Sequence, residues 1–168
     1  PPSGDWYVEM SGDGKFVPMN PSDNFNGLGK LTFRITPKLK LSGHLLYAES
    51  NWKSYVHSYK YNPDGTYNYA NQNSNYSVKL NHAIGLRSYY EANVFYSTTD
   101  YSQFLFEDPL DPNYVRTDWI NTEPSSATFV FGGTQMGHSY RKSNSVGGKF
   151  DFTSQITSKH EIKIGTSV

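Results

Sequence analysis

The sequence contains no cysteine, which excludes a disulfide framework and any metal or redox site built on thiolates. It has no excess of either charge, because 15 basic residues balance 15 acidic ones. A chain that binds nucleic acid through its electrostatic field is normally basic, so no nucleic-acid partner is expected. It also has no apolar run near the roughly 18 residues that a membrane-spanning helix needs, which excludes a helical membrane protein.

Aromatic residues, by contrast, are plentiful. The chain has 14 tyrosines, 10 phenylalanines and 3 tryptophans, which is too aromatic for a wholly disordered chain. No long segment shows the helical spacing of apolar residues, and Gly, Pro, Asn and Ser interrupt every candidate. The chain opens on Pro1-Pro2 and closes inside a strand-like run, so we expect a mature product or a piece of a longer protein.

Apolar and polar residues alternate with period two in six segments, each of which predicts a two-faced β-strand. One face is expected to carry Leu31, Phe33, Leu41, Leu45, Val78, Leu80, Val94 and Phe150, and the opposite face Lys40, Lys79 and Lys149. The predicted strands are about 28–36, 39–50, 74–84, 88–98, 143–154 and 160–168.

The connections between these strands alternate between short and long. The segments 36–38, 85–87 and 157–159 read as tight hairpin turns. The segments 1–25, 51–73 and 99–142 read as long loops rich in Tyr, Asn, Ser, Asp, Gly and Pro. An antiparallel up-and-down meander follows, with its short turns at one end and its long loops at the other.

Alternation alone does not say whether the apolar face meets another sheet or lipid. Loops of some forty residues are uncommon in compact soluble domains, whereas long external loops are typical of outer-membrane barrels. The strands 39–50 and 88–98 also approach the roughly 9–11 residues that cross a bilayer at a tilt. We therefore expect an all-β fold in which residues 1–168 form part of a transmembrane β-barrel with long external loops.

No segment carries a motif for catalysis or for cofactor binding. The five histidines lack zinc-site spacing, and the aspartates at 108, 111 and 118 lack the spacing of a calcium loop. The glutamates at 49, 91 and 107 show no sign of a glycosidase pair. We expect no catalytic residue, no metal and no cofactor, and hence a protein that is not an enzyme.

Aromatic side chains interleaved with Asn, Ser and Asp crowd the long loops. Such rings can stack on and hydrogen-bond a glycan or a peptide, as tyrosines do in antibody loops. They can equally pack the loops onto one another, and the sequence leaves both roles open. The candidate ligand-binding residues are Trp52, Tyr55, Tyr59, Tyr61, Tyr114 and Trp119.

The segment 31–50, LTFRITPKLKLSGHLLYAES, resembles a strand–turn–strand unit from the barrels of TonB-dependent outer-membrane receptors, nearest to the large Bacteroidetes type. The run 59–65, YKYNPDG, is similar to the external loops of that family. The family's plug domain, TonB box and terminal aromatic signal are absent from these 168 residues, as expected for an internal barrel fragment.

The resemblance implies a location in the outer membrane of a Gram-negative bacterium and import of a nutrient such as a glycan, peptide or chelate. It implies as partners the outer-membrane lipid, the remainder of the same barrel, a TonB-type energiser and a surface lipoprotein. Two alternatives stay open: a soluble or secreted all-β glycan-binding module, and a structural surface protein.

Overall fold

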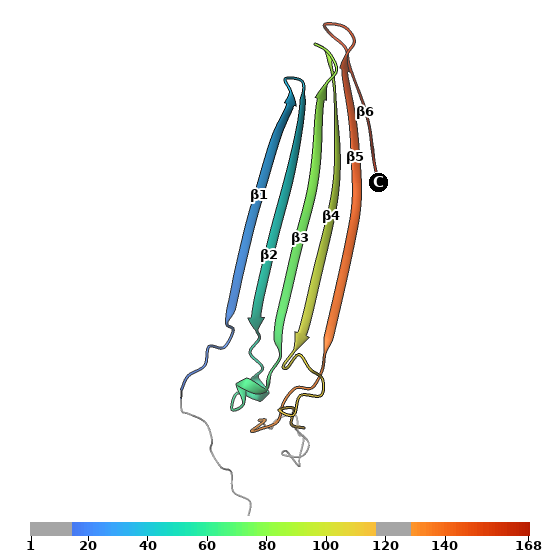
Figure 1. Cartoon of the computed structure of the whole chain (residues 1–168). Coiled ribbons are helices and arrows are strands. Elements are labelled where there is room, and N and C mark those ends of the chain that lie inside the picture. The colour runs from blue at the N-terminus through green and yellow to red at the C-terminus, as the bar shows by residue number, and fades with distance from the viewer. Residues whose placement is uncertain (1–14, 117–128) are drawn as a thin grey trace, which may run out of the picture.

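The computed structural model describes residues 15–116 and 129–168, and the regular secondary structure in this part is almost entirely β-strand (Figure 1). Two short 3-10 helices, η1 (His57–Tyr59) and η2 (Pro63–Gly65), lie in the first long connection. The six strands are β1 (Ser22–Thr36), β2 (Leu39–Lys53), β3 (Asn68–Ala83), β4 (Ser88–Phe104), β5 (Ser139–Gln155) and β6 (Glu161–Ser167).

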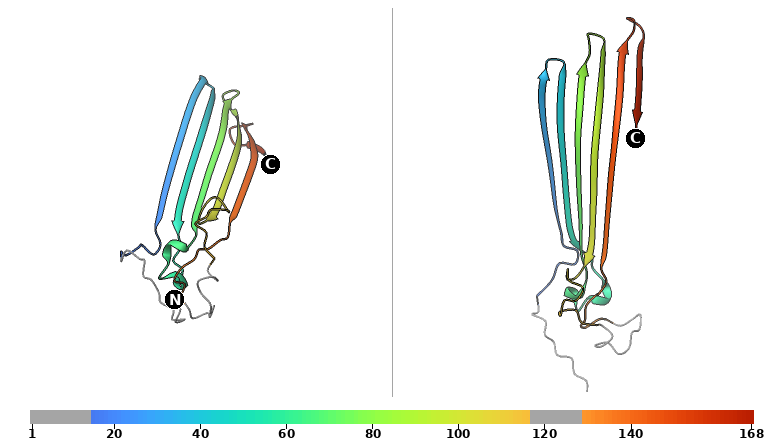
Figure 2. Two further views of the ribbon diagram at one scale, coloured as in Figure 1. Left: turned by 60° about the horizontal axis from the view of Figure 1, so that its bottom comes forward. Right: turned by 45° about the vertical axis from the view of Figure 1, so that its right-hand side comes forward.

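The strands form one antiparallel sheet in the order of the sequence, β1-β2-β3-β4-β5-β6. The three short turns lie together at one end and the long connections at the other (Figures 1 and 2). These findings confirm the predicted meander and its separation of turns from loops. The sheet is open, with β1 and β6 at its two edges, and the structure by itself shows no closed barrel.

The first five strands are longer than the alternation predicted, and the loops are correspondingly shorter, whereas β6 is one residue shorter at each end than the predicted 160–168. Residues 51–53, 68–73, 99–104 and 139–142, expected in loops, belong to β2, β3, β4 and β5, and residues 22–25 belong to β1. The prediction was wrong there because polar side chains occupy both faces of the strand ends, so the period-two signal disappears while the backbone ladder continues. Trp52 and Tyr69, for example, are partners in the β2–β3 ladder.

Strand register assigns every side chain to one of two faces. The first, which we call the banded face, carries all eight apolar residues expected together, including Leu41, Leu80 and Phe150 in successive partnered positions. The second, the polar face, carries Lys40, Lys79 and Lys149. The predicted division of these residues between two faces is confirmed.

The banded face is apolar over only part of its height. In the half of the sheet nearer the short turns, this face carries leucine, valine and phenylalanine, among them Leu31, Val78, Val94 and Phe150. We call this region the apolar band. Tyr76 and Tyr96 stack at 6.4 Å between ring centroids at the edge of this band. Tyr47 lies on the same face, one row of side chains farther from the short turns. Beyond the tyrosines the same face becomes mostly polar and charged, in a row of Glu49, Gln72, Asp100 and Lys142 that also contains Phe25 on β1.

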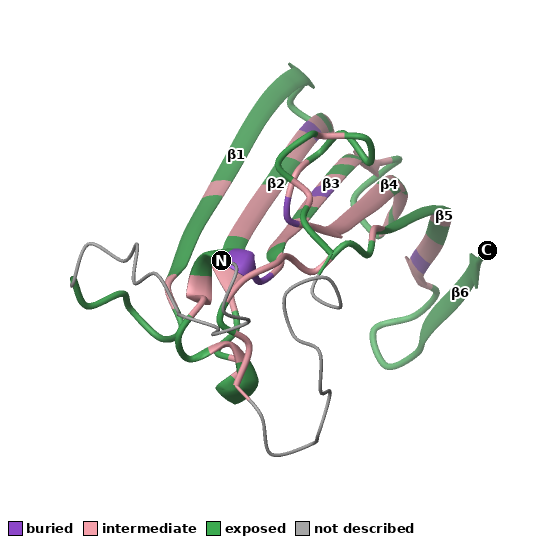
Figure 3. Ribbon diagram, turned by 90° about the horizontal axis from the view of Figure 1, so that it is seen from below, coloured by how far each residue is buried: buried purple, intermediate pink, exposed green. Residues whose placement is uncertain are grey.

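Nothing in the described residues covers the apolar band. Leu31, Val78 and Val94 remain 68%, 53% and 60% exposed, and Leu105 is the one buried hydrophobic residue among those described. The colouring by burial in Figure 3 shows the same: buried positions are small, separate patches on a single layer of strands. The chain therefore exposes a large apolar surface, and such surfaces usually contact a partner protein or a membrane.

No helix within the described ranges is long and apolar enough to cross a membrane.

Candidate functional site

The long connections meet at one end of the sheet and bond to each other. The Val130 amide donates to the Ser58 carbonyl at 2.7 Å, and the Gln135 amide donates to the Gly65 carbonyl at 2.8 Å. The Asn62 side-chain amide donates to the Gly133 carbonyl at 2.6 Å. The loop 54–67 is therefore held to residues 129–138 of the second connection as one assembly, which we call the loop end.

A ladder of side chains crosses four strands on the polar face, just below the loop end. Trp52 stacks on Tyr69 at 5.4 Å with an interplanar angle of 11°, and its centroid lies 6.5 Å from that of Tyr101. The Arg141 guanidinium lies 5.8 Å from the Tyr101 ring centroid. Strand register explains the order, because Trp52 opposes Tyr69 and Tyr101 opposes Arg141. We call these four residues the rim ladder.

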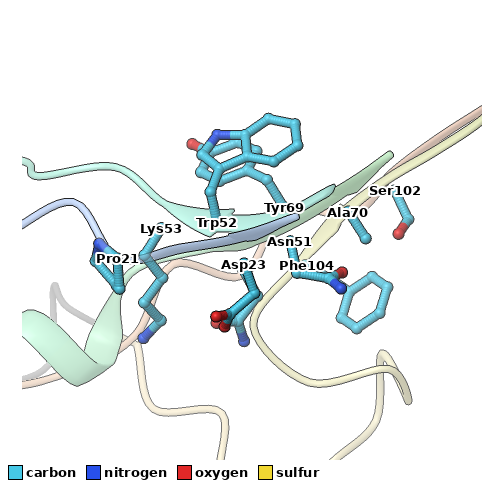
Figure 4. A pocket seen from close by; sticks show the side chains of 10 residues that line it. Pro21, Asp23, Asn51, Trp52, Lys53, Tyr69, Ala70, Ser102 and Phe104 are labelled. Carbon is cyan, nitrogen blue, oxygen red and sulfur yellow. The ribbon is translucent and has the colours of Figure 1, made fainter. Parts of the chain in front are cut away.

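The rim ladder lies beside amides and hydroxyls on the same face. Tyr101 donates a hydrogen bond to Gln103 Oε1 at 3.2 Å, and Thr99 donates to Asn73 Oδ1 at 2.7 Å. Figure 4 shows Trp52 and Tyr69 together on one side of the sheet, with Asp23, Asn51 and Phe104 on the other. Flat rings next to neutral hydrogen-bonding groups are suited to a ligand that has both apolar faces and hydroxyl or amide groups.

Tyr55 and Tyr61 belong to a second cluster, inside the loop end. The Tyr55 hydroxyl lies 2.8 Å from His57 Nδ1, and His57 meets the Phe129 ring edge-on at 5.4 Å. Tyr61 meets Phe129 at 5.1 Å and stacks on Phe131 at 5.4 Å. These rings pack the two connections against each other, which is the alternative role that the sequence left open. Tyr61 nevertheless keeps 54% of its surface exposed.

Tyr114 has a structural role. Its hydroxyl accepts a hydrogen bond from the Phe106 amide, donates to the Phe106 carbonyl and lies near His138 Nε2, each at 2.9 Å. Its ring meets Phe106 edge-on at 5.0 Å. A hydroxyl with three partners has no capacity left for a ligand, so Tyr114 is better described as the residue that closes the turn after β4.

Tyr59 and Trp119 are the last two candidates, and the ring contacts of the two clusters do not include Tyr59. Tyr59 lines a cleft with Val17, Met19 and Val56, and burial raises the pKa of its hydroxyl, with a further contribution from Tyr67. Trp119 lies outside the described residues. The structure thus divides the candidates: Trp52 belongs to the rim ladder, Tyr55 and Tyr61 to the loop cluster, and Tyr114 to the turn after β4.

Tyr69, Tyr101 and Arg141 were not among the predicted ligand-binding residues, although Tyr69 and Tyr101 lie in the segments expected to be long aromatic loops. A cue was present, since Trp52, Tyr69 and Tyr101 continue the period-two positions of their strands. Arg141 gave no such cue, because its place beside Tyr101 depends on the pairing of β4 with β5.

No cluster of three or more His, Cys, Asp or Glu suited to a metal ion occurs in the described part of the chain. Searches against family models, curated proteins and solved structures found no match to this chain.

Proposed function

We propose that this chain is a segment of the wall of a transmembrane β-barrel, in an outer-membrane receptor that imports a nutrient. The observation that carries the proposal is the change of polarity along the banded face. A sheet that packs in a soluble sandwich keeps its inner face apolar along the strand, whereas a membrane strand needs apolar residues only at lipid depth.

The dimensions and edges of the apolar band fit a bilayer. From Tyr76 to Ile84 the band covers eight residue steps, roughly 26 Å along the chain, which at the usual tilt of barrel strands spans roughly 20 Å of the roughly 25 Å apolar band of membrane barrels. Tyr76 and Tyr96 lie at its loop-side edge, and His82 and Tyr90 pack edge-on at 5.2 Å near its turn-side edge. Aromatic rings at both edges suit the two membrane interfaces.

The polar face at the same depth suits a hydrated lumen. Lys79 pairs with Glu91 at 3.0 Å, and Lys149 pairs with Asp151 at 2.8 Å, directly behind the apolar band. Charges at this depth require water, since a charge facing lipid near mid-bilayer destabilises a barrel by roughly 2–4 kcal/mol for Arg or Lys.

In a membrane, the open edges of the sheet require further strands to pair with them. Among the described residues, the outer edge of β1 pairs with no other strand. β6 pairs with Lys149–Gln155 of β5, and two further backbone hydrogen bonds join Gly148 to Val168. Unpaired backbone groups do not persist in lipid. We assign these edges to other strands of the same barrel, with outer-membrane lipid against the apolar band.

The loop end is then the external surface, and the rim ladder lines the lumen directly beneath it. Ligand recognition is assigned to Trp52 and its neighbours, and transport would use a TonB-type energiser and a surface lipoprotein, as the resemblance implies. The resemblance and the two-faced sheet support this proposal together.

The absence of cysteine makes a direct test available. Single cysteines at positions 77, 78, 79 and 80 carry a fluorophore in the whole barrel that contains this chain, and that barrel is reconstituted in bilayers containing brominated lipids, which quench fluorescence by contact. The proposal expects strong quenching at 78 and 80 and weak quenching at 77 and 79. Equal quenching at all four positions, or none at any, would refute the membrane-wall proposal.

A further inference from the structure

The zero net charge conceals an uneven distribution along the strands. The half of the sheet nearer the short turns comprises residues 28–46, 75–97 and 145–168, and it holds nine of the 15 basic residues but only three of the 15 acidic ones. The described residues outside this half are nearly balanced, with six basic and seven acidic. The turn-side half therefore carries a charge of +6 at neutral pH.

The three acidic residues of this half are already paired. Glu91 pairs with Lys79, Asp151 with Lys149, and Glu161 with Lys163, at distances between 2.8 and 3.0 Å. Six cations in the half then have no carboxylate within ion-pair distance among the described residues. They are Lys30, Arg34, Lys38, Lys40, Arg87 and Lys159.

Three of these cations lie one in each short turn, in a repeated arrangement. An isoleucine stands three residues before each of them: Ile35 before Lys38, Ile84 before Arg87, and Ile156 before Lys159. The three isoleucines are between 56% and 58% exposed. Each turn thus places an exposed apolar side chain close to an unpaired cation, at the edge of the apolar band.

The first turn also forms a cleft suited to an anion. It is lined by Arg34, Lys38 and Lys40 together with Thr36, Asn81 and Tyr89, and no carboxylate lines it. Arg34 and Lys40 are direct ladder partners on β1 and β2. Like charges directly opposite in a sheet destabilise it, so a bound anion would stabilise this hairpin.

We propose that the short-turn end binds the headgroups of anionic phospholipids. This inference rests on the proposed function, which places that end at a membrane surface. Lys38, Arg87 and Lys159 contact phosphates there, while the three isoleucines lie in the adjoining apolar layer. A polybasic surface that served only an acidic protein would not need an isoleucine repeated in every turn.

The test compares the full chain with K38Q/R87Q/K159Q by flotation with vesicles. One set of vesicles is phosphatidylcholine alone, and the other is phosphatidylcholine and phosphatidylglycerol in equal parts. A Lys or Arg near an anionic surface is stabilised by about 1 kcal/mol, or about five-fold in binding. The triple variant should therefore lose about 100-fold of its partition into the anionic vesicles at low salt, and almost nothing with the neutral ones.

The matched control is K53Q/K60Q/K142Q, which removes the same charge in the loop end and the adjoining ends of β2 and β5, and should keep the preference for anionic vesicles. Equal losses in both triple variants would overturn the inference, because net charge rather than place would then decide. Equal partition of the unmodified chain into both vesicles would also overturn it, while leaving the membrane wall intact. Failure to float with either vesicle would likewise overturn it, while the quenching measurement tests the membrane wall separately. Turn-dependent binding to polyglutamate without any lipid preference would assign the surface to an acidic protein and reject the lipid.

Discussion

Glu91 and Asp151 lie directly opposite each other on β4 and β5, although both are acidic. Each is paired with a lysine on the same face, Glu91 with Lys79 at 3.0 Å and Asp151 with Lys149 at 2.8 Å. The four residues form a quartet across three strands, in which each carboxylate is paired with one lysine. The repulsion between the carboxylates is thus balanced locally, and the quartet is stable only where water or further polar groups reach the polar face.

The quartet gives a prediction about stability. Replacing both lysines in K79M/K149M leaves the two carboxylates facing each other without a cation, so the urea midpoint should fall. The fourfold variant K79M/E91Q/K149M/D151N removes the repulsion as well and should recover most of that loss. A fourfold variant no more stable than the double one would show that the charges are not coupled across β4 and β5.

Arginine substitutions on the two faces of β3 should have different effects on the free energy of unfolding. Leu80→Arg should lower the free energy of unfolding in lipid by roughly 2–4 kcal/mol, because it brings a charge into the apolar band. Ser77→Arg, on the polar face of the same strand, should cost well under half as much. Denaturant titration of the reconstituted protein measures both, and equal costs would contradict the assignment of the faces.

The proposed function assigns ligand contact to Trp52 of the rim ladder. Trp52→Ala removes its stacking on Tyr69 and should weaken ligand binding, while assembly of the proposed barrel, judged by heat-modifiable gel mobility, should be unchanged. Trp52→Phe keeps a flat ring and should retain most of the binding. The readout is a titration with soluble glycans, peptides and iron chelates. Normal binding by the alanine variant to a ligand of the unmodified protein would remove the rim ladder from recognition.

Tyr114→Phe tests the structural role of the tyrosine hydroxyl. The variant loses an oxygen that meets Phe106 and His138, and an unsatisfied polar group costs about 1–3 kcal/mol. Amide hydrogen exchange should rise in residues 105–116 and 134–138 while the strands stay protected. Tyr55→Phe is the control, because the exposed Tyr55 hydroxyl has a single side-chain partner, His57. Similar exchange in the two variants would contradict the role assigned to Tyr114.

The sequence predicted the parts of the fold in which local alternation reflects burial. The run from Leu39 to Tyr47 predicts a strand because one of its two faces is apolar. Asn71, Gln72 and Asn73 do not, because polar residues occupy both faces there, and only pairing with β2 and β4 shows that the strand continues. The candidate site was harder to predict because its contacts, too, join residues that are distant in the sequence. Contact of Tyr114 with His138 joins residues 24 positions apart through loop conformation, which no local pattern encodes.

Gly147 lies on the polar face, where the absence of a side chain leaves room for the neighbouring ring of Phe95. It is the ladder partner of Phe95, and a Cβ at Gly147 would lie 2.5 Å from the Phe95 Cζ and 2.9 Å from the Val168 carbonyl oxygen. Gly147→Ala should therefore destabilise the sheet by about 1–3 kcal/mol, the usual cost of overpacking. Phe95→Ala removes the ring, so G147A/F95A should be less destabilised than the sum of the single variants, as denaturant titration of all three can measure. Gly148→Ala is the control, because its nearest neighbour atom would lie 3.6 Å away. Additive losses in the double variant would place the obstruction at the backbone near Val168 instead of at the Phe95 ring.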